Sequence, residues 1–127
     1  MTRISWNDYF LNMAKAAATR STCPRLSVGA VLTLNNYILS SGYNGAPSGE
    51  QHCDDIGCEM VDGHCKRARH AEVNAVTTLS KINQPVFSRK SLREKMVLYC
   101  THKPCKYCEA ILTGYGITNI VYDKEYP

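Results

Sequence analysis

The sequence has little of what a membrane protein or a nucleic-acid-binding surface requires. Its 127 residues include one Trp and two Phe, and 15 Lys and Arg stand against 11 Asp and Glu, a net charge of only +4. Nucleic-acid binders usually combine a stronger basic excess with stacking aromatics, so we expect no nucleic-acid partner. No stretch approaches the roughly 20 apolar residues of a membrane span, and the polar N-terminus lacks a signal-peptide core. We therefore expect no membrane association and a cytoplasmic location.

Cysteine, in contrast, is abundant. The chain has seven cysteines, and an odd number in a cytoplasmic setting favours metal binding over disulfide bonds. The length and the hydrophobic content of 44% are typical of one soluble globular domain, which we expect to span residues 1–127. The small positive charge is compatible with a phosphate-bearing substrate.

Two separated motifs supply the side chains of a metal-dependent hydrolytic site. His70-Ala71-Glu72 comes first, and Pro104-Cys105-Lys106-Tyr107-Cys108 follows downstream. One imidazole and two thiolates can hold zinc with a fourth position open to water, whose pKa the metal lowers towards roughly 7. A Cys-x-x-Cys pair alone is equally typical of a structural zinc site or a redox pair, and His-x-Glu alone is a weak signal. Together the motifs favour a catalytic zinc, with Glu72 as the group that moves protons.

The spacing of these residues predicts their local structure. Cys105 and Cys108 are three apart and would share one helix face, and Pro104 is expected at the first helical position. Both thiols would then lie in the first turn, where the helix dipole favours thiolates. His70 is expected to open a second helix, so that two helix N-termini meet around one metal.

The rest of the chain reads as a mixture of helices and strands. Asn35-Asn36 tolerates positive φ and suits a tight hairpin between the first two strands. A strand, a short helix and a strand at the C-terminal end imply a parallel pair with a right-handed crossover. The pattern predicts an α/β protein with a mixed sheet. The expected helices are 5–20, 70–81 and 104–115, and the expected strands are 28–34, 37–40, 96–100 and 119–122, with a loop at 42–49 and an irregular stretch up to about residue 69.

Several motifs together resemble the deoxycytidylate (dCMP) deaminase family, whose fold is the cytidine deaminase-like α/β/α sandwich with a mixed central sheet. The matching segments are Arg20-Ser21-Thr22-Cys23-Pro24-Arg25, Val28-Gly29-Ala30-Val31, the loop from Gly42 to Gly49, His70 to Ala75, and Pro104 to Cys108. The Gly-Tyr-Asn-Gly loop points to enzymes of nucleoside monophosphates in particular. The resemblance implies hydrolysis of dCMP to dUMP and ammonia, which feeds thymidylate synthesis. It also implies a homohexamer that dCTP activates and dTTP inhibits, with Mg²⁺ accompanying the effector.

The resemblance also assigns roles to individual residues. His70, Cys105 and Cys108 would hold the catalytic Zn²⁺, and Glu72 would protonate the pyrimidine ring nitrogen and then the departing amine. Asn44 would contact the sugar, its alternative being a turn residue. Arg25 would bind the 5′-phosphate or, alternatively, be a solvated surface charge. Tyr126 would approach the substrate. Its position near the chain terminus favours the alternative, in which it makes no contact with the substrate.

A second, structural zinc is also expected from the resemblance. Its proposed ligands are Cys23, Cys53, Cys58 and Cys65, with His52 or His64 as substitutes. The alternative is a set of reduced thiols, with His64 lying near the substrate phosphate instead. Cys100 is expected to be a small buried hydrophobic residue.

The chain departs from the family at its C-terminal end. Family members commonly continue beyond the region of Tyr122 with another helix and a fifth strand, so the fourth strand would be an open edge or be covered by another subunit.

The rival interpretations are a zinc deaminase acting on tRNA adenosine, free cytidine or a riboflavin precursor, and a catalytically silent zinc module that binds nucleic acid.

Overall fold

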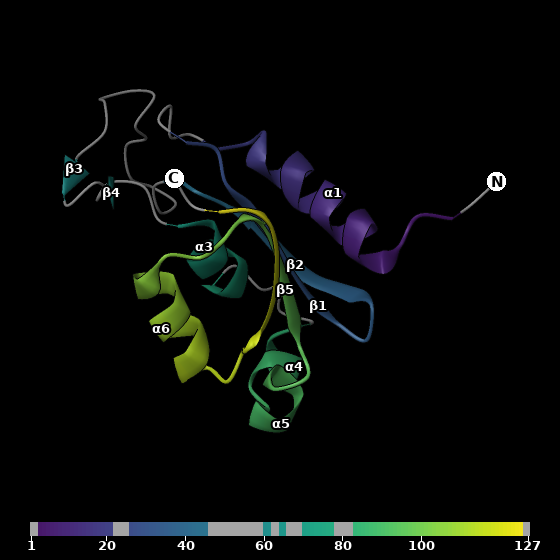
Figure 1. The fold of residues 1–127 in the computed structure, drawn as a ribbon. Coiled ribbons are helices and arrows are strands. Elements are labelled where there is room, and N and C mark those ends of the chain that lie inside the picture. The colour runs from purple at the N-terminus through teal and green to yellow at the C-terminus, as the bar shows by residue number, and fades with distance from the viewer. Residues whose placement is uncertain are drawn as a thin grey trace.

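The computed structural model of the protein describes residues 3–21, 26–45, 60–61, 64–65, 70–77 and 83–125. The described ranges contain both helices and strands, as the sequence pattern predicts for an α/β protein (Figure 1). In chain order the elements are α1 (Trp6–Ala18), β1 (Gly29–Leu34), β2 (Tyr37–Tyr43), β3 (Met60–Val61), β4 (His64–Cys65), α3 (Ala71–Thr77), α4 (Gln84–Phe87), α5 (Lys90–Arg93), β5 (Val97–His102), α6 (Lys106–Gly114) and β6 (Asn119–Lys124).

The central sheet is mixed, which confirms the prediction. Its strand order is β2-β1-β5-β6, with β1 antiparallel to both β2 and β5. The β5 and β6 strands are parallel and are joined through α6, as the strand–helix–strand pattern predicts. Within the described ranges, β2 and β6 form the two edges of this sheet.

Alternating side chains of the inner strands build two cores on opposite faces of the sheet. Val31 of β1 and Tyr99 of β5 pack with Phe10 and Ala14 of α1. Their neighbours along the strands point the other way, because side chains alternate across a strand. That second core joins Ala30, Leu32, Leu98 and Cys100 to Ala71 and Ala75 of α3 and Leu112 of α6. Figure 1 accordingly shows α1 on one face and α3 with α6 on the other, the predicted α/β/α sandwich.

Local signals in the sequence define the first helix and the hairpin. The Ser5 hydroxyl accepts a hydrogen bond from the Asp8 backbone N–H, which caps α1. Asn35 and Asn36 have φ of 51° and 65°, the left-handed conformation that a two-residue turn between antiparallel strands requires. The hairpin agrees with the sequence-based expectation.

Two glycines allow helices to lie directly on the sheet. A Cβ added to Gly29 of β1 would lie 1.9 Å from the Ala14 carbonyl oxygen of α1. A Cβ added to Gly42 of β2 would lie 2.4 Å from the Ala75 nitrogen of α3. The sheet therefore holds each helix at a separation that no larger residue would permit at these positions.

Several boundaries differ from the predicted ones. The third predicted helix begins at Lys106 with Cys105 as its N-cap, so Pro104 lies outside the helix and the prediction that it occupies the first helical position was wrong. The first helix is shorter than 5–20, and β2 continues to Tyr43, into the predicted loop. The sequence reading also missed α4, α5 and the β3–β4 hairpin, since elements of two to four residues carry no measurable periodicity.

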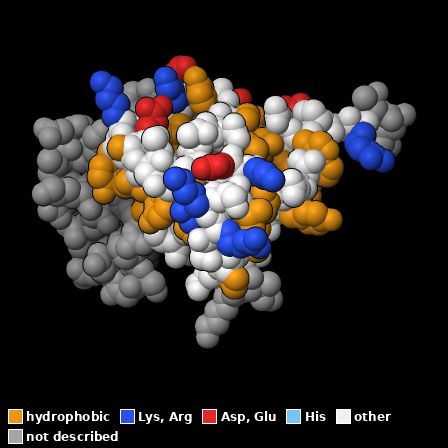
Figure 2. Space-filling view, turned by 90° about the horizontal axis from the view of Figure 1, so that it is seen from below, with side chains coloured by type: hydrophobic (Ala, Val, Ile, Leu, Met, Phe, Trp, Pro, Cys, Tyr) orange, Lys and Arg blue, Asp and Glu red, His pale blue; other side chains and the backbone are white. Residues whose placement is uncertain are grey.

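One group of charged side chains lies at the α4–α5 end of the molecule, away from the metal-binding motifs. Figure 2 shows Lys and Arg side chains around an acidic group on the face formed by the α4–α5 end of the molecule. Exposed residues of this region are Arg89, Lys90, Glu94 and Lys95. They precede β5, whereas Cys105 follows it, so the two regions lie at opposite ends of the strand (Figure 1).

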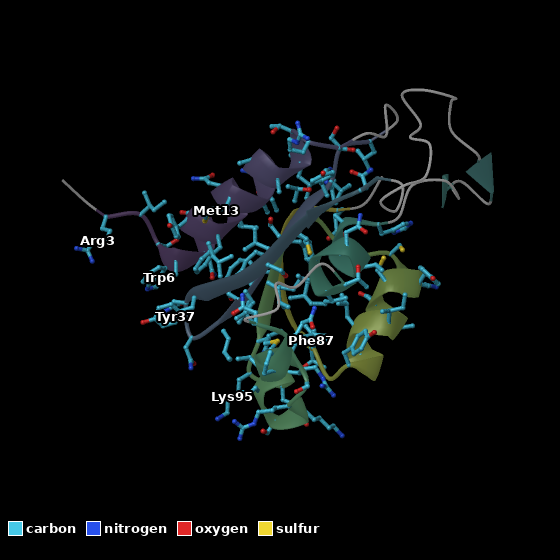
Figure 3. All side chains as sticks on the ribbon, turned by 180° about the vertical axis from the view of Figure 1, so that it is seen from behind. Arg3, Trp6, Met13, Tyr37, Phe87 and Lys95 are labelled. Carbon is cyan, nitrogen blue, oxygen red and sulfur yellow. The ribbon has the colours of Figure 1, made fainter. Side chains whose placement is uncertain are left out.

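Large apolar side chains are exposed at another side of the molecule. Trp6 of α1 is 56% exposed, and Tyr37 at the hairpin turn is 76% exposed. Figure 3 places both side chains on the same side of the molecule. In the part of the chain that the structure describes, no helix has the length and apolar character that a membrane crossing demands.

Candidate metal centre and active site

His70, Cys105 and Cys108 form the candidate metal centre, as predicted from the two motifs. Their ligand atoms all lie within 4.8 Å of one another. The His70 Nδ1 atom is 3.5 Å from the Cys105 Sγ atom and 3.0 Å from the Cys108 Sγ atom. Residues 35 or more positions apart in the sequence are therefore brought together around one small volume.

The donor set and its spacing fit zinc. For a tetrahedral site with Zn–S of about 2.3 Å and Zn–N of about 2.0–2.1 Å, sulfur and nitrogen atoms lie roughly 3.5 Å apart. The Cys105 distance matches this value and the Cys108 distance is shorter. One nitrogen and two sulfur ligands are typical of catalytic zinc, because a position remains for water.

Two helix N-termini supply these ligands. His70 directly precedes α3, and its carbonyl oxygen accepts a hydrogen bond from the Asn74 backbone N–H at 3.0 Å. Cys105 is the N-cap of α6 with extended φ and ψ of −70° and 168°, and Cys108 lies in the first turn. Backbone N–H groups and the positive end of the helix dipole at such positions stabilise thiolates. The predicted meeting of two helix N-termini is confirmed. His70 is the residue before α3, and Cys105 is the residue before α6.

Cys108 and Glu72 are buried next to each other, which makes a cation favourable at this point. Burial raises the pKa of the Cys108 thiol, and the nearby Glu72 carboxylate and Cys105 raise that pKa further. A divalent cation offsets this accumulation of negative groups and keeps the thiols deprotonated. The chemistry of the donor set therefore supports a bound metal.

Glu72 has the environment of a group that exchanges protons. It lies on α3, two residues after His70, and only 4% of it is exposed to solvent. Burial raises the pKa of the Glu72 carboxyl, while hydrogen bonds from its own backbone N–H and from the Cys108 side chain act in the opposite direction. Because Glu72 is not among the three grouped ligands, its carboxylate can take and return a proton beside the metal.

Asn44 lies at the end of β2 and holds the segment that leads into β1. Its side-chain Oδ1 accepts a hydrogen bond from the Val28 N–H at 2.8 Å, and its Nδ2 donates to the Leu26 carbonyl at 2.5 Å. A carboxamide has two N–H groups and two acceptor lone pairs, so each end keeps one further hydrogen-bonding position. The structure thus gives Asn44 a structural role, and its predicted contact with a sugar stays a prediction.

Other predicted site residues lie outside the part of the chain that the structure describes. These are Cys23, Arg25, His52, Cys53, Cys58 and Tyr126. His64 and Cys65 form β4, whose backbone pairs with β3 through Val61↔His64 and Met60↔Cys65. The second zinc site therefore stays a prediction.

Residues that the sequence reading did not single out also support the site. Asn74 of α3 donates its side-chain N–H to the Tyr43 carbonyl at 2.6 Å. Thr101, which ends the buried part of β5, accepts a hydrogen bond from the Gly29 N–H at 3.1 Å. A polar residue with low helix propensity inside a helix was the available signal for Asn74. Cys100 is fully buried, as predicted.

A mixed sheet that brings a His, two Cys and a buried Glu together at helix N-termini defines the class of zinc-dependent deaminases. Comparison with known proteins agrees. Residues 4–124 match the family described as the cytidine and deoxycytidylate deaminase zinc-binding region. The chain belongs to this family.

Full-length similarity extends to several curated relatives. ComE operon protein 2 of Bacillus subtilis is 42% identical over 126 residues, which cover 99% of this chain and 63% of that protein. The deoxycytidylate deaminase of Schizosaccharomyces pombe is 33% identical, and the match covers 98% of this chain but 38% of the relative. The chain thus spans less than two thirds of the length of these two relatives. The deoxycytidylate deaminase of Mycobacterium phage D29 is 34% identical over 98% of this chain and 99% of its own length.

Solved structures show the same fold. A dCMP deaminase from the cyanophage S-TIM5, in complex with dCMP and dUMP, has a TM-score of 0.75 and 28% identity, covering 99% of this chain and 86% of that one. A tRNA:A34 deaminase has a TM-score of 0.60 at 19% identity, a likeness that concerns the fold alone.

Proposed function

We propose that the protein is a zinc-dependent deaminase that hydrolyses dCMP to dUMP and ammonia. The observation that carries this proposal is the buried Glu72 carboxylate beside the His70–Cys105–Cys108 group. The substrate is supported by the phage relative of matching length and by the similar structure that holds dCMP and dUMP.

The chain's own residues would perform the proton transfers. Zinc held by His70, Cys105 and Cys108 would acidify a water molecule so that it loses a proton near neutral pH. Glu72 would accept that proton, donate it to the pyrimidine ring nitrogen and assist the departure of the amine at carbon 4 as ammonia. One water is consumed, and its oxygen becomes the carbonyl oxygen of dUMP. Burial keeps Glu72 away from bulk water, so the proton remains in the site during the exchange.

Substrate contacts form a further part of the proposal. The second amide position of Asn44 would bind a sugar hydroxyl, Arg25 would bind the 5′-phosphate through its guanidinium fork, and Tyr126 would approach the nucleotide. A structural zinc bound by Cys23, Cys53, Cys58 and Cys65, with His52 or His64 as substitutes, belongs to the same proposal. It predicts two zinc ions per chain by mass spectrometry under native conditions and one in a C53S/C58S double variant.

Regulation and assembly are proposed from the family resemblance. We expect a homohexamer in the cytoplasm, activation by dCTP with Mg²⁺ and inhibition by dTTP. Light scattering coupled to size-exclusion chromatography would measure the subunit number, and rates with each effector would measure the control.

The experiment that tests the function is ammonia release from a set of substrates. Zinc-loaded protein would be incubated with dCMP, CMP, deoxycytidine and a tRNA substrate under identical conditions. The proposal predicts the highest kcat/KM for dCMP. Turnover of tRNA or of the free nucleoside alone would move the protein to another substrate class, and failure with all four would contradict the deaminase assignment.

A further inference from the structure

Asn74 connects the helix of the metal centre to the end of an edge strand. It lies on α3, four residues after the ligand His70, and its backbone N–H donates to the His70 carbonyl at 3.0 Å. Its side-chain Nδ2 donates to the Tyr43 carbonyl at the end of β2, at 2.6 Å. A single residue thus contacts both the backbone of a metal ligand and the strand on which α3 packs.

Close backbone packing and a second hydrogen bond also join α3 to β2. Ala71 and Ala75 lie on Gly42, where no side chain separates the two backbones. The Ser40 hydroxyl donates to the Ala75 carbonyl. Apolar packing is non-directional, so it sets the height of the helix above the sheet better than it sets rotation about the helix axis. The directional bonds at Ser40 and Asn74 restrict that rotation.

Rotation of α3 matters because Glu72 and His70 lie at its N-terminal end. The Asn74 bond is the nearer of the two directional bonds to the chemistry, since Ala75 follows Asn74 and both follow Glu72. A small rotation would change the direction of the Glu72 carboxylate and of the His70 ring at the same time. A misplacement of about 1 Å can lower an enzyme's rate about 100-fold.

The same bond leads on to the segment around Asn44. Tyr43, whose carbonyl accepts the Asn74 bond, directly precedes Asn44. Asn44 in turn bonds to Val28 and Leu26 through both ends of its side chain. The hydrogen bonds therefore form a continuous series from α3 through the end of β2 to the segment that enters β1.

We propose that Asn74 is a positioning residue that fixes the rotation of α3 and thereby aligns Glu72 and His70 with the two cysteines. It acts through Tyr43 and need not touch substrate. The kinetic part of its test rests on the proposed function, whereas the spectroscopic part does not.

Three substitutions separate the hydrogen bond from the volume of the side chain. N74D keeps the shape but replaces the donor with an oxygen that repels the Tyr43 carbonyl. N74A removes the donor, and N74Q retains it on a longer side chain. T77A is the matched control, because Thr77 lies on the same helix, is exposed and donates to the Val73 carbonyl within α3.

The first measurement is the visible absorption spectrum of the full chain loaded with one equivalent of Co²⁺. All variants carry C53S/C58S, which removes the proposed second site, so the spectrum reports the ligand geometry of the His-Cys-Cys centre without substrate. We expect N74D and N74A to shift the ligand-field bands, N74Q to restore them in part, and T77A to match the wild type. The second is steady-state turnover of dCMP by the zinc protein. We expect kcat of N74D to fall by about 10- to 100-fold with metal content unchanged.

A cobalt spectrum for N74D identical to that of the wild type would overturn the proposal, as would a kcat changed no more than in T77A. A loss of kcat that the lower melting temperature explains, with unshifted Co²⁺ ligand-field bands, would assign Asn74 a purely structural role. This result would also overturn the proposal. If N74D does not fold, N74A carries the same comparison. If the wild type does not turn over dCMP, the proposed function fails while the cobalt spectra still decide the role of Asn74.

Discussion

At the scale of single residues, Glu72 is the group on which turnover should depend most strongly. E72Q keeps the size of the side chain but cannot accept a proton, and general acid–base groups contribute about 10²- to 10⁴-fold to rate. We expect E72Q to lose dCMP turnover by about that factor while zinc content, measured by mass spectrometry, stays at the wild-type value. E109Q changes an exposed glutamate of α6 and should retain activity. A comparable loss in both variants, or none in E72Q, would contradict the proposed role.

Tyr99 gives a prediction for the dependence of stability on pH. Burial raises its pKa, and its hydroxyl donates to the Asn7 side chain at 3.2 Å. A raised pKa in the folded state means that this contribution is complete below the unfolded-state pKa of about 10 and is lost as pH rises through the folded-state value. Urea unfolding above that pH should therefore show a steeper loss of the free energy of unfolding for the wild type than for Y99F. Y37F, which alters an exposed tyrosine, should follow the wild type, and parallel curves for all three would refute the prediction.

At the scale of secondary-structure elements, substitutions of two glycines distinguish a loss of stability from a change in the geometry of the site. G29A would force α1 away from the sheet, and G42A would force α3 away, because each added Cβ meets helix backbone at 1.9 Å or 2.4 Å. Such overpacking costs about 1–3 kcal/mol or more. We expect both variants to melt at lower temperature but only G42A to lower kcat below what its stability explains, since α3 carries Glu72.

The matched control for this pair is G114A, whose added Cβ would meet no atom of the described residues within 4 Å. It should keep both activity and melting temperature. Equal losses of kcat in well-folded G29A and G42A would show that α3 is not specifically coupled to the active site.

The elements differ in how far the sequence defines them, and the reasons are physical. The apolar runs of β1 and β5 and the Asn35-Asn36 turn are local signals, so these strands and the hairpin were predictable. The grouping of His70, Cys105 and Cys108 was predictable because a metal restricts the types and spacing of its donors. The start of α6 at Lys106 was missed because proline is compatible with the residue before the N-cap as well as with the first helical position. The role of Asn74 was missed because its partner, Tyr43, is 31 residues away.

At the scale of the whole molecule, the metal should link the two helices of one face and stabilise the fold. Ligands from α3 and α6 meet only in the folded chain, so zinc binding adds to the free energy of unfolding. Free zinc at about 1,000 times its dissociation constant stabilises by about 4 kcal/mol, which corresponds to roughly 10–15 °C for a chain of this size. Calorimetry with and without a chelator should show a decrease of this order. H70A should lose the part of this decrease that the His-Cys-Cys centre contributes, so the chelator should lower its melting temperature less than that of the wild type. Equal sensitivity in H70A would assign the effect to another site.

The central claim is that the buried Glu72 and the His-Cys-Cys centre deaminate dCMP. The most direct measurement is the ultraviolet absorbance of dCMP mixed with zinc-loaded protein, with dCTP and Mg²⁺ present. The account predicts loss of the cytosine band, formation of dUMP and an equal amount of ammonia, all absent with E72Q. An unchanged spectrum from protein with confirmed zinc content would contradict it.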